Sequence, residues 1–202
     1  MLTKPIFYDS DVIICFLEIE KQDLLKKLFS KIEMPQQVFI ELTKEKTPKN
    51  VKNNLKKLIS EGFVEIREIN FATPEYIKYD CISKGYWSKD LQSVGKGESE
   101  AIALAIENNG IVASNNLNDV EEICEEFNVP IITASIILSF AYELQLYSKD
   151  EINSIWSKII DETYQIMPCH TFDKYYKELF KKDCENLLKN YDFKKHYKKE
   201  KK

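Results

Sequence analysis

Apolar residues along this chain follow two repeating patterns. Short apolar runs, such as residues 5–8, are typical of buried strands. Between these runs, apolar residues recur every three or four positions, which predicts helices that bury one face. The runs predict strands at 5–8, 63–69, 111–114, 129–133 and 165–168. The recurring positions predict helices at 11–18, 21–32, 36–44, 49–62, 74 to about 92, 95–110, 118–128, 134–146 and 149–164.

Strands that alternate with helices indicate an α/β fold around a mostly parallel sheet. Binding sites in such sheets form beyond the carboxyl ends of the strands. After about residue 170 a helical segment leads into a lysine-rich end. We therefore expect a main domain at 1–170 and a helical C-terminal extension at 171–202. We expect the last ten residues to be disordered, because they offer little surface to bury.

Composition narrows the class of protein. The chain has 202 residues, 44% of them hydrophobic, which is enough for one substantial core. Its net charge of −4 does not fit a uniformly basic nucleic-acid coat protein. No apolar run approaches the ~20 residues that span a membrane, and the N-terminus lacks a signal-peptide layout. The five cysteines form no Cys-x-x-Cys pair, which favours reduced thiols in a cytoplasmic protein and argues against zinc.

Several acidic residues occupy unusual positions. Asp9 ends the first predicted strand, and Glu41 lies close to the apolar stripe of its helix. Glu98 stands in the first turn of the helix at 95–110, where the positive end of the helix dipole favours an acid. Polar residues also follow the strand at 111–114: Asn115, Asn116 and Asp119.

Each of these acids has a simple structural explanation. Asp9 can cap the next helix, Glu98 can be an ordinary first-turn acid, and Glu41 can reach outward to solvent. Asp11, two residues after Asp9, is expected in the first helical turn as an acid that the helix dipole favours. As a group they are harder to explain, because like charges repel unless a cation neutralises them. Mg²⁺ or Mn²⁺ prefers oxygen ligands and can activate water for phosphodiester hydrolysis. Spacing alone does not show that the carboxylates converge.

Four segments carry a resemblance to a known family: IFYDSDVIICFL, MPQQVFIELTK, GKGESEAIALAIENNGIVASNNLNDV and VPIITASIILSFAYELQL. Across residues 5–147 the chain resembles the PIN-domain superfamily, in particular the VapC-type ribonuclease toxins of toxin–antitoxin pairs. The resemblance implies a three-layer α/β/α sandwich with a central, mostly parallel sheet. It also implies three or four acidic residues that bind Mg²⁺ or Mn²⁺ and hydrolyse RNA. Carried over by position, the catalytic and metal-binding acids are Asp9, Glu41 and Glu98.

The fourth acidic position departs from the family pattern. Many members place an aspartate beside or two residues after a strand-end serine or threonine, which corresponds here to Ser114. This chain has Asn115 and Asn116 at those places, and Asp119 is one helical step further. We predict that Asn116 and Asp119 complete the metal site, although an amide lowers its negative charge. The sequence leaves open which of Asn115, Asn116 and Asp119 fills the fourth position.

We therefore expect a metal-dependent endoribonuclease, the toxin of a toxin–antitoxin pair, with an antitoxin protein and a second copy of the chain as candidate partners. Lysine-rich segments at 44–57 and near the C-terminus are candidates for RNA contact, although a solvated helix face explains them equally well. One alternative is a PIN-like binding or regulatory module with a weakened site. Another is a haloacid-dehalogenase phosphatase with Asp9 as nucleophile, but Ile13 stands where that motif needs threonine.

Overall fold

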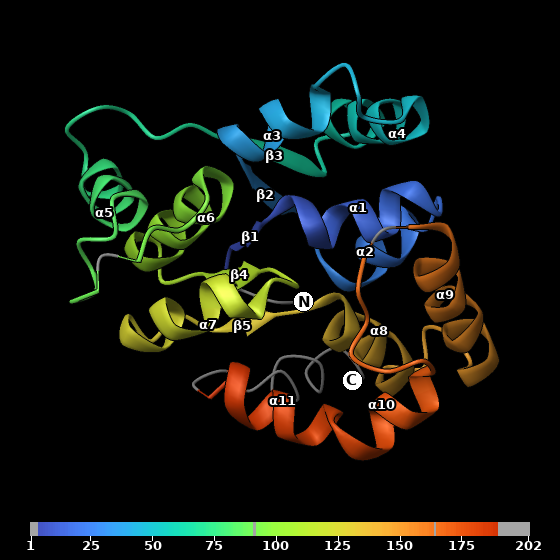
Figure 1. Ribbon diagram of the computed structural model, residues 1–202. Helices are drawn as coiled ribbons and strands as arrows, with labels where there is room; N and C mark the ends of the chain where they lie inside the picture. The colour runs from blue at the N-terminus through green and yellow to red at the C-terminus, as the bar shows by residue number, and fades with distance from the viewer. Residues whose placement is uncertain (1–3, 91, 164, 190–202) are drawn as a thin grey trace, which may run out of the picture.

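A single parallel sheet of five strands organises the protein (Figure 1). The computed structural model describes residues 4–90, 92–163 and 165–189. The strands lie in the order β3-β2-β1-β4-β5, and every neighbouring pair is parallel. Their bounds are β1 Ile6–Tyr8, β2 Ile32–Pro35, β3 Val64–Arg67, β4 Ile111–Ala113 and β5 Ile131–Ile132.

Helices cover both faces of the sheet, as an α/β/α sandwich requires. In Figure 1, α5, α6 and α7 lie on one side of the sheet, and α1, α2, α8 and α9 lie on the other. Among the described residues, no helix combines the length and apolarity needed to cross a bilayer. The helices are α1 Ser10–Glu18, α2 Gln22–Leu28, α3 Gln36–Thr43, α4 Lys49–Ser60, α5 Pro74–Ser83, α6 Lys96–Glu107, α7 Leu117–Glu126, α8 Ala134–Glu143, α9 Lys149–Glu162, α10 Phe172–Glu178 and α11 Phe180–Leu187.

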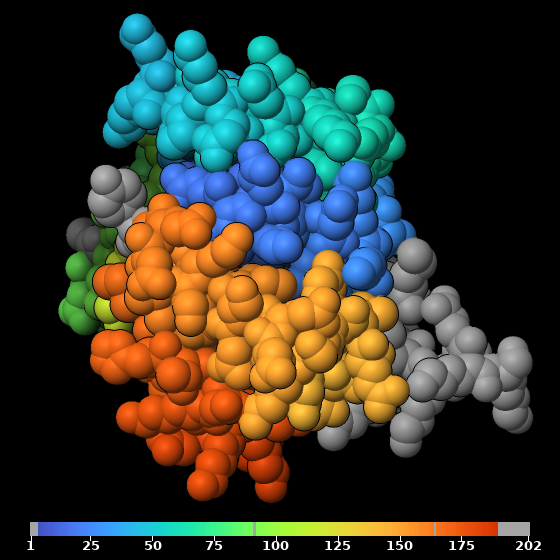
Figure 2. Space-filling view, turned by 90° about the vertical axis from the view of Figure 1, so that its right-hand side faces the viewer, coloured from blue at the N-terminus to red at the C-terminus, as the bar shows by residue number. Residues whose placement is uncertain are grey.

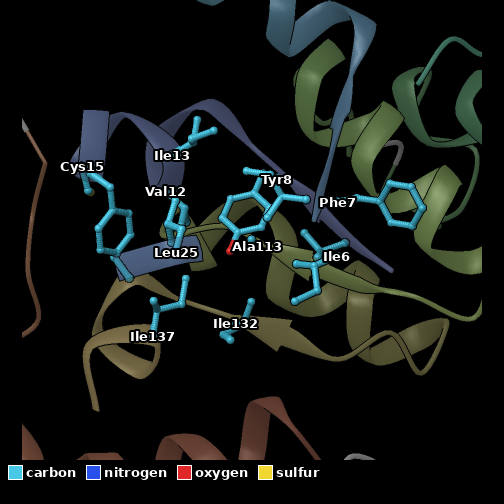
Figure 3. Packing of buried hydrophobic residues seen from close by; sticks show 14 of the residues in the cluster. Ile6, Phe7, Tyr8, Val12, Ile13, Cys15, Leu25, Ala113, Ile132 and Ile137 are labelled. Atoms are coloured by element: carbon cyan, nitrogen blue, oxygen red, sulfur yellow. The ribbon is translucent and has the colours of Figure 1, made fainter. Parts of the chain in front are cut away.

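The central strand β1 is buried on both faces. Its three residues, Ile6, Phe7 and Tyr8, are at most 3% exposed. Successive side chains of a strand point to opposite faces: Figure 3 shows Phe7 directed towards α6, with Ile6 and Tyr8 directed away from it. A strand buried in this way carries a continuous apolar run, which is why the sequence identified it readily.

The chain adds strands to the sheet first on one side of β1 and then on the other. From β1 the chain proceeds outward through β2 to β3, then crosses back to β4 on the other side of β1. In parallel α/β sheets a crevice opens at such a switch point, beyond the carboxyl ends of the two strands. The residues that follow β1 and β4 therefore occupy the position where this fold type builds its sites.

The three-layer fold with a mostly parallel sheet is confirmed, but one predicted strand was wrong and one strand was not predicted. Residues 165–168 form no strand; Ile166 is 87% exposed and gains nothing from burial there. The sheet instead takes its fifth strand from β2, part of which the sequence assigned to a helix. An acidic residue interrupts that apolar run: Glu33 is 4% exposed and forms ion pairs with Arg67 and Lys31. Arg67, on the neighbouring strand β3, neutralises the buried charge of Glu33. Because Arg67 is far from Glu33 in the sequence, the local pattern does not indicate this pairing.

The C-terminal helices pack on α8 and α9 through aromatic rings. Trp156 donates its indole N–H to the Cys169 carbonyl at 2.9 Å, and its ring lies against Phe172 and Tyr175. In the space-filling view the segment around α9 (orange) lies between the α1–α2 region (blue) and the C-terminal helices (red) (Figure 2). A separate domain boundary at residue 170 stays a prediction, and the expected disorder of the last ten residues lies outside the described residues.

Gly110 offers a test of the close packing between β4 and β1. A Cβ at this position would lie 2.7 Å from Phe7 Cε2 and 2.9 Å from the Pro5 carbonyl oxygen. We expect Gly110→Ala to lower the free energy of unfolding by about 1–3 kcal/mol, because the backbone at Pro5 cannot move without disturbing the strand. Urea denaturation followed by circular dichroism measures this change.

The matched control is Asn53→Ala, on the exposed side of α4, which should change the free energy of unfolding by less than about 0.5 kcal/mol. Equal stability of the native chain and Gly110→Ala would contradict the close packing of Gly110 against Pro5 and Phe7.

Candidate functional site

Asp9 stands at the carboxyl end of β1, at the switch point of the sheet. Its backbone N–H donates to the Ala113 carbonyl at 2.8 Å, which ties it to the end of β4. Its Oδ1 accepts from the Ser10 backbone N–H at 2.7 Å, so Asp9 caps α1 as the simple explanation requires. The residue is nonetheless only 3% exposed. A cap in contact with solvent would not need such burial, so the capping role does not account for its surroundings.

Glu41 approaches Asp9 across the surface of α6. A Cβ placed on Gly97 would lie 3.4 Å from Asp9 Oδ1 and 3.5 Å from Glu41 Oε2. The carboxylates of β1 and α3 thus converge on one point above the first turn of α6. The same Cβ would lie 3.2 Å from Val38 Cγ2, so a glycine is what keeps this space open.

Glu98 lies in the first turn of α6, as the sequence predicted. A Cβ on Gly95 would lie within 2.2 Å of Glu98 Oε2, so the Glu98 side chain folds back over the start of its own helix. Two residues further on, Glu100 is 7% exposed and its Oε2 accepts from the Gln37 backbone N–H at 2.8 Å. Glu100 therefore satisfies a free N–H at the start of α3, the helix that carries Glu41. The sequence analysis did not single out Glu100.

Asp11 and Asn115 join α1 to the segment after β4. The Asn115 backbone N–H donates to Asp11 Oδ2 at 2.8 Å, and the Ser114 hydroxyl lies 3.5 Å from the same oxygen. The Asn115 side-chain amide donates to the Asp11 carbonyl at 3.3 Å and accepts from the Ala134 backbone N–H at 2.9 Å. Asn115 thereby connects the starts of α1 and α8.

Asn116 and Asp119 form a separate pair at the start of α7. The Asn116 amide donates to Asp119 Oδ2 at 2.7 Å, and its backbone N–H donates to the Ser114 hydroxyl at 3.2 Å. Asp119 is exposed, and Asn116 is half-buried. Their part in a metal site stays a prediction, since no contact joins them to Asp9, Glu41 or Glu98 among the described residues.

Negative charge accumulates around Asp9. Burial raises the pKa of Asp9 well above its usual range, and the charges of Asp11, Glu98 and Glu41 raise it further in that order, against the opposing Ser10 hydrogen bond. Burial likewise raises the pKa of Asp11 to about 6, although the backbone N–H groups of Asn115, Asn116 and Val12 lower it, in that order. The protein therefore gathers four carboxylates into one electrostatic neighbourhood, with Asp9 buried and the other three half-buried, an arrangement that is costly without a cation.

The carboxylates do not surround a common centre as the side chains stand. Among the described residues, no three histidine, cysteine, aspartate or glutamate side chains are arranged to hold a metal ion. The position of Glu98, folded over Gly95, accounts for part of this.

Comparison with known protein families identifies the family of the chain. A family model described as PIN domain matches residues 5–169. The chain belongs to the PIN-domain family. The match covers the sheet, the residues that follow β1 and β4, and the start of α6, so it includes every element that contributes a carboxylate to the neighbourhood of Asp9.

Other comparisons add little to this assignment. No curated protein matches the chain. One matching solved structure, described as FitAB bound to an IR36 DNA fragment, is 14% identical with a TM-score of 0.45. The match covers 64% of this chain and 94% of that one. Family membership therefore rests on the family model.

Sequence reasoning found three of the four carboxylates in this neighbourhood and treated the fourth, Asp11, only as an acid favoured by the helix dipole. Asp11 does lie in the first turn of α1, but its side chain points to the segment after β4. The spacing Asp9-Ser10-Asp11 at a strand end was the available signal. This spacing could not show that Asp11 faces the segment after β4, because the local sequence does not determine on which side of β1 the strand β4 lies.

The raised pKa of Asp11 predicts how the free energy of unfolding depends on pH in the presence of EDTA. The Asp11 pKa moves from 3.8 to about 6, so the native state holds more protons than the unfolded chain across this interval. The free energy of unfolding therefore contains a contribution that falls as pH rises from about 4 to about 6. We expect Asp11→Asn to remove it, so that the melting temperature of the variant relative to the native chain rises by roughly 5 °C between pH 4 and pH 7.

Thermal melts of both proteins in EDTA at half-unit pH steps measure this difference. An Asp119→Asn variant serves as control, because Asp119 is exposed and pairs only with Asn116. Parallel melting curves for Asp11→Asn and the native chain at every pH would contradict the raised pKa.

Proposed function

We propose that the chain is a metal-dependent endoribonuclease. The observation that carries the proposal is the approach of Asp9 and Glu41 to the space above Gly97, with the charges of Glu98 and Asp11 acting on Asp9. Repulsion among these groups disfavours the metal-free arrangement, and a divalent cation relieves it. Family membership supports the same chemistry, because the PIN resemblance implies RNA hydrolysis with Mg²⁺ or Mn²⁺.

The residues present fit such a cation. All the nearby donors are carboxylate oxygens, which Mg²⁺ and Mn²⁺ prefer. Gly97 leaves free a space that any side chain would fill, directly beside oxygens of Asp9 and Glu41. Asp9, Glu41 and Glu98 are the proposed ligands, and Asn116 and Asp119 stay the sequence-based candidates for completing the set.

Each residue then has a distinct task. When bound, a divalent cation supplies an activated water and neutralises the charge that develops on the phosphodiester. Asp9, held by Ser10 and Ala113, provides a fixed oxygen at the floor of the site. Glu41 closes the site from α3, in a position that the Glu100 contact with Gln37 maintains. Glu98 stands in the first turn of α6, from where its charge acts on Asp9.

RNA contact is proposed for the exposed lysines that follow Glu41. Lys44 and Lys46 lie in the loop after α3, and Lys49, Lys56 and Lys57 lie on α4; all five are exposed. Point charges of this kind bind the phosphate backbone without reading sequence. Their place directly after the helix that carries Glu41 would bring a bound backbone towards the carboxylates.

The proposed setting is a toxin–antitoxin pair in the cytoplasm. The toxin role, an antitoxin partner and a homodimer all follow from the resemblance to PIN toxins. The cytoplasmic location follows from the cysteines, all five of which are free thiols. A weakened binding module is the second candidate, favoured by the asparagines at 115 and 116 and by the lack of three ready metal-binding side chains among the described residues.

Cleavage of total RNA by the purified chain tests the nuclease proposal. We expect cleavage in Mn²⁺ or Mg²⁺, none in EDTA, and a loss of at least about 100-fold in Asp9→Asn, which removes the charge and keeps the side-chain shape. Asp161→Asn, on the exposed side of α9 and outside the proposed ligand set, is the control for a surface acid. A well-folded chain, free of any co-purified protein, that cleaves no RNA in either metal would favour the binding module instead.

Gly97→Ala provides a test in which stability and activity separate. Alanine favours a helix by up to about 1 kcal/mol, but its methyl group would crowd Val38 Cγ2 at 3.2 Å. These two effects oppose each other, so the melting temperature should stay within about 3 °C of the native value. The methyl group would occupy the space beside Asp9 Oδ1 and Glu41 Oε2, so RNA cleavage should fall at least about tenfold.

Gly62→Ala is the matched control with the opposite pattern. Gly62 has φ +71° and open space around its Cα, so alanine there should cost about 1–2 kcal/mol of stability while cleavage is retained. Full cleavage by Gly97→Ala would show that the space above α6 is not part of the site.

A further inference from the structure

The fourth acidic position of the proposed site has no obvious occupant after β4. Asn115 is fully engaged: its amide donates to the Asp11 carbonyl and lies 3.5 Å from Cys15 Sγ, and its Oδ1 accepts from the Ala134 backbone N–H. Releasing this side chain for a metal would break the connection between α1 and α8. Asn116 and Asp119 bind each other, and Asp119 is exposed. A fourth carboxylate must therefore come from elsewhere if the site has one.

Asp11 holds one carboxylate oxygen in a hydrogen bond and, among the described residues, leaves the other without one. Its Oδ2 is fixed by the Asn115 backbone N–H at 2.8 Å, which sets the orientation of the whole carboxylate. Its Oδ1 is buried and, among the described residues, has no hydrogen-bond partner. A buried carboxylate oxygen without a partner costs more than about 1 kcal/mol, and such an atom in a native protein calls for an explanation.

The position of Asp11 points to the same site. It follows Asp9 by two residues in the first turn of α1, and of the neighbouring charges it acts on Asp9 more strongly than Glu98 or Glu41 does. The carboxylate that the sequence lacks at Asn115 is thus present on the residue that Asn115 binds. The contact between Asp11 and Asn115 therefore contains one acid and one amide, and the acid lies on α1 instead of after β4.

We propose that Asp11 supplies the fourth carboxylate of the metal site, through its unpartnered Oδ1, in place of an acid after β4. The inference rests on the proposed metal-dependent function and names one of its ligands. Asn115 then acts as a positioning residue: its backbone N–H holds Oδ2, which leaves Oδ1 for the cation. This arrangement restores the negative charge that Asn115 and Asn116 take away.

Binding of Mn²⁺ to the EDTA-stripped full chain, measured by titration calorimetry, tests the inference without any dependence on RNA cleavage. Four proteins are compared: the native chain, Asp11→Asn, Asp119→Asn and Asp9→Asn. Asparagine at position 11 keeps an oxygen that can accept from Asn115 and removes only the charge. We expect Asp11→Asn to weaken Mn²⁺ binding about tenfold or more, and to weaken it more than Asp119→Asn, the variant of the rival fourth ligand, does.

The outcomes separate this inference from the proposed function. Native-like Mn²⁺ affinity in Asp11→Asn, together with loss of binding in Asp9→Asn, would make Asp11 a purely structural residue and leave the nuclease proposal standing. Loss of binding in Asp119→Asn but not in Asp11→Asn would return the fourth position to α7. A native chain that binds no Mn²⁺ would overturn both proposals.

A second variant covers a failure of Asp11→Asn to fold. Asp11→Ser carries a short hydroxyl that suits the first turn of a helix and likewise lacks the charge. Its melting temperature in EDTA reports folding, and its Mn²⁺ affinity should fall as in Asp11→Asn. A folded Asp11→Ser chain with native affinity would contradict the proposal.

Discussion

The hydrogen bond from the Asp9 backbone N–H to the Ala113 carbonyl, at 2.8 Å, is the contact on which the site depends. It joins the carboxyl ends of β1 and β4 at the point where the strand order reverses. Because of this bond, the residues after β1 and those after β4 occupy the same small region. Asp9 is held on the floor of that region, Asp11 and Asn115 face each other across it, and the first turn of α6 forms its remaining wall through Gly97.

The second constraint is electrostatic. A sheet with helices on both faces buries the residues that follow its central strands, so a carboxylate at that position loses much of its hydration. Asp9 is 3% exposed, and three other carboxylates act on it. A structural role alone, such as capping α1, is equally well served by serine or asparagine, which carry no charge. The concentration of acids is therefore costly for the metal-free fold, and a site for a cation gives it a physical reason.

Several parts of the fold could be predicted because they depend on local chemistry. The apolar run at 5–8, Thr73 before Pro74 and the first turn of α6 are each determined by neighbouring residues. The strand β2 could not be predicted in the same way, since Glu33 is acceptable there only because Arg67 lies beside it on β3. Residues 165–168 show the reverse failure: their apolar residues suit a strand, but no strand in the described part of the chain pairs with them.

The site divides along the same line. Asp9, Glu41 and Glu98 could be found from their places in successive elements, whereas their approach to one space depends on Gly97, whose role appears only when α3 and β1 are packed against α6.

The exchange between Asp11 and Asn115 is the clearest case of a feature that sequence position conceals. Read along the chain, asparagines after β4 indicate a loss of charge. In three dimensions Asn115 binds an aspartate from α1, so the negative charge lies a few ångströms away, on the other partner of the same hydrogen bond. A metal site responds to the charge within its reach and not to the element that supplies it, so an acid missing from one strand end does not by itself argue for a weakened site.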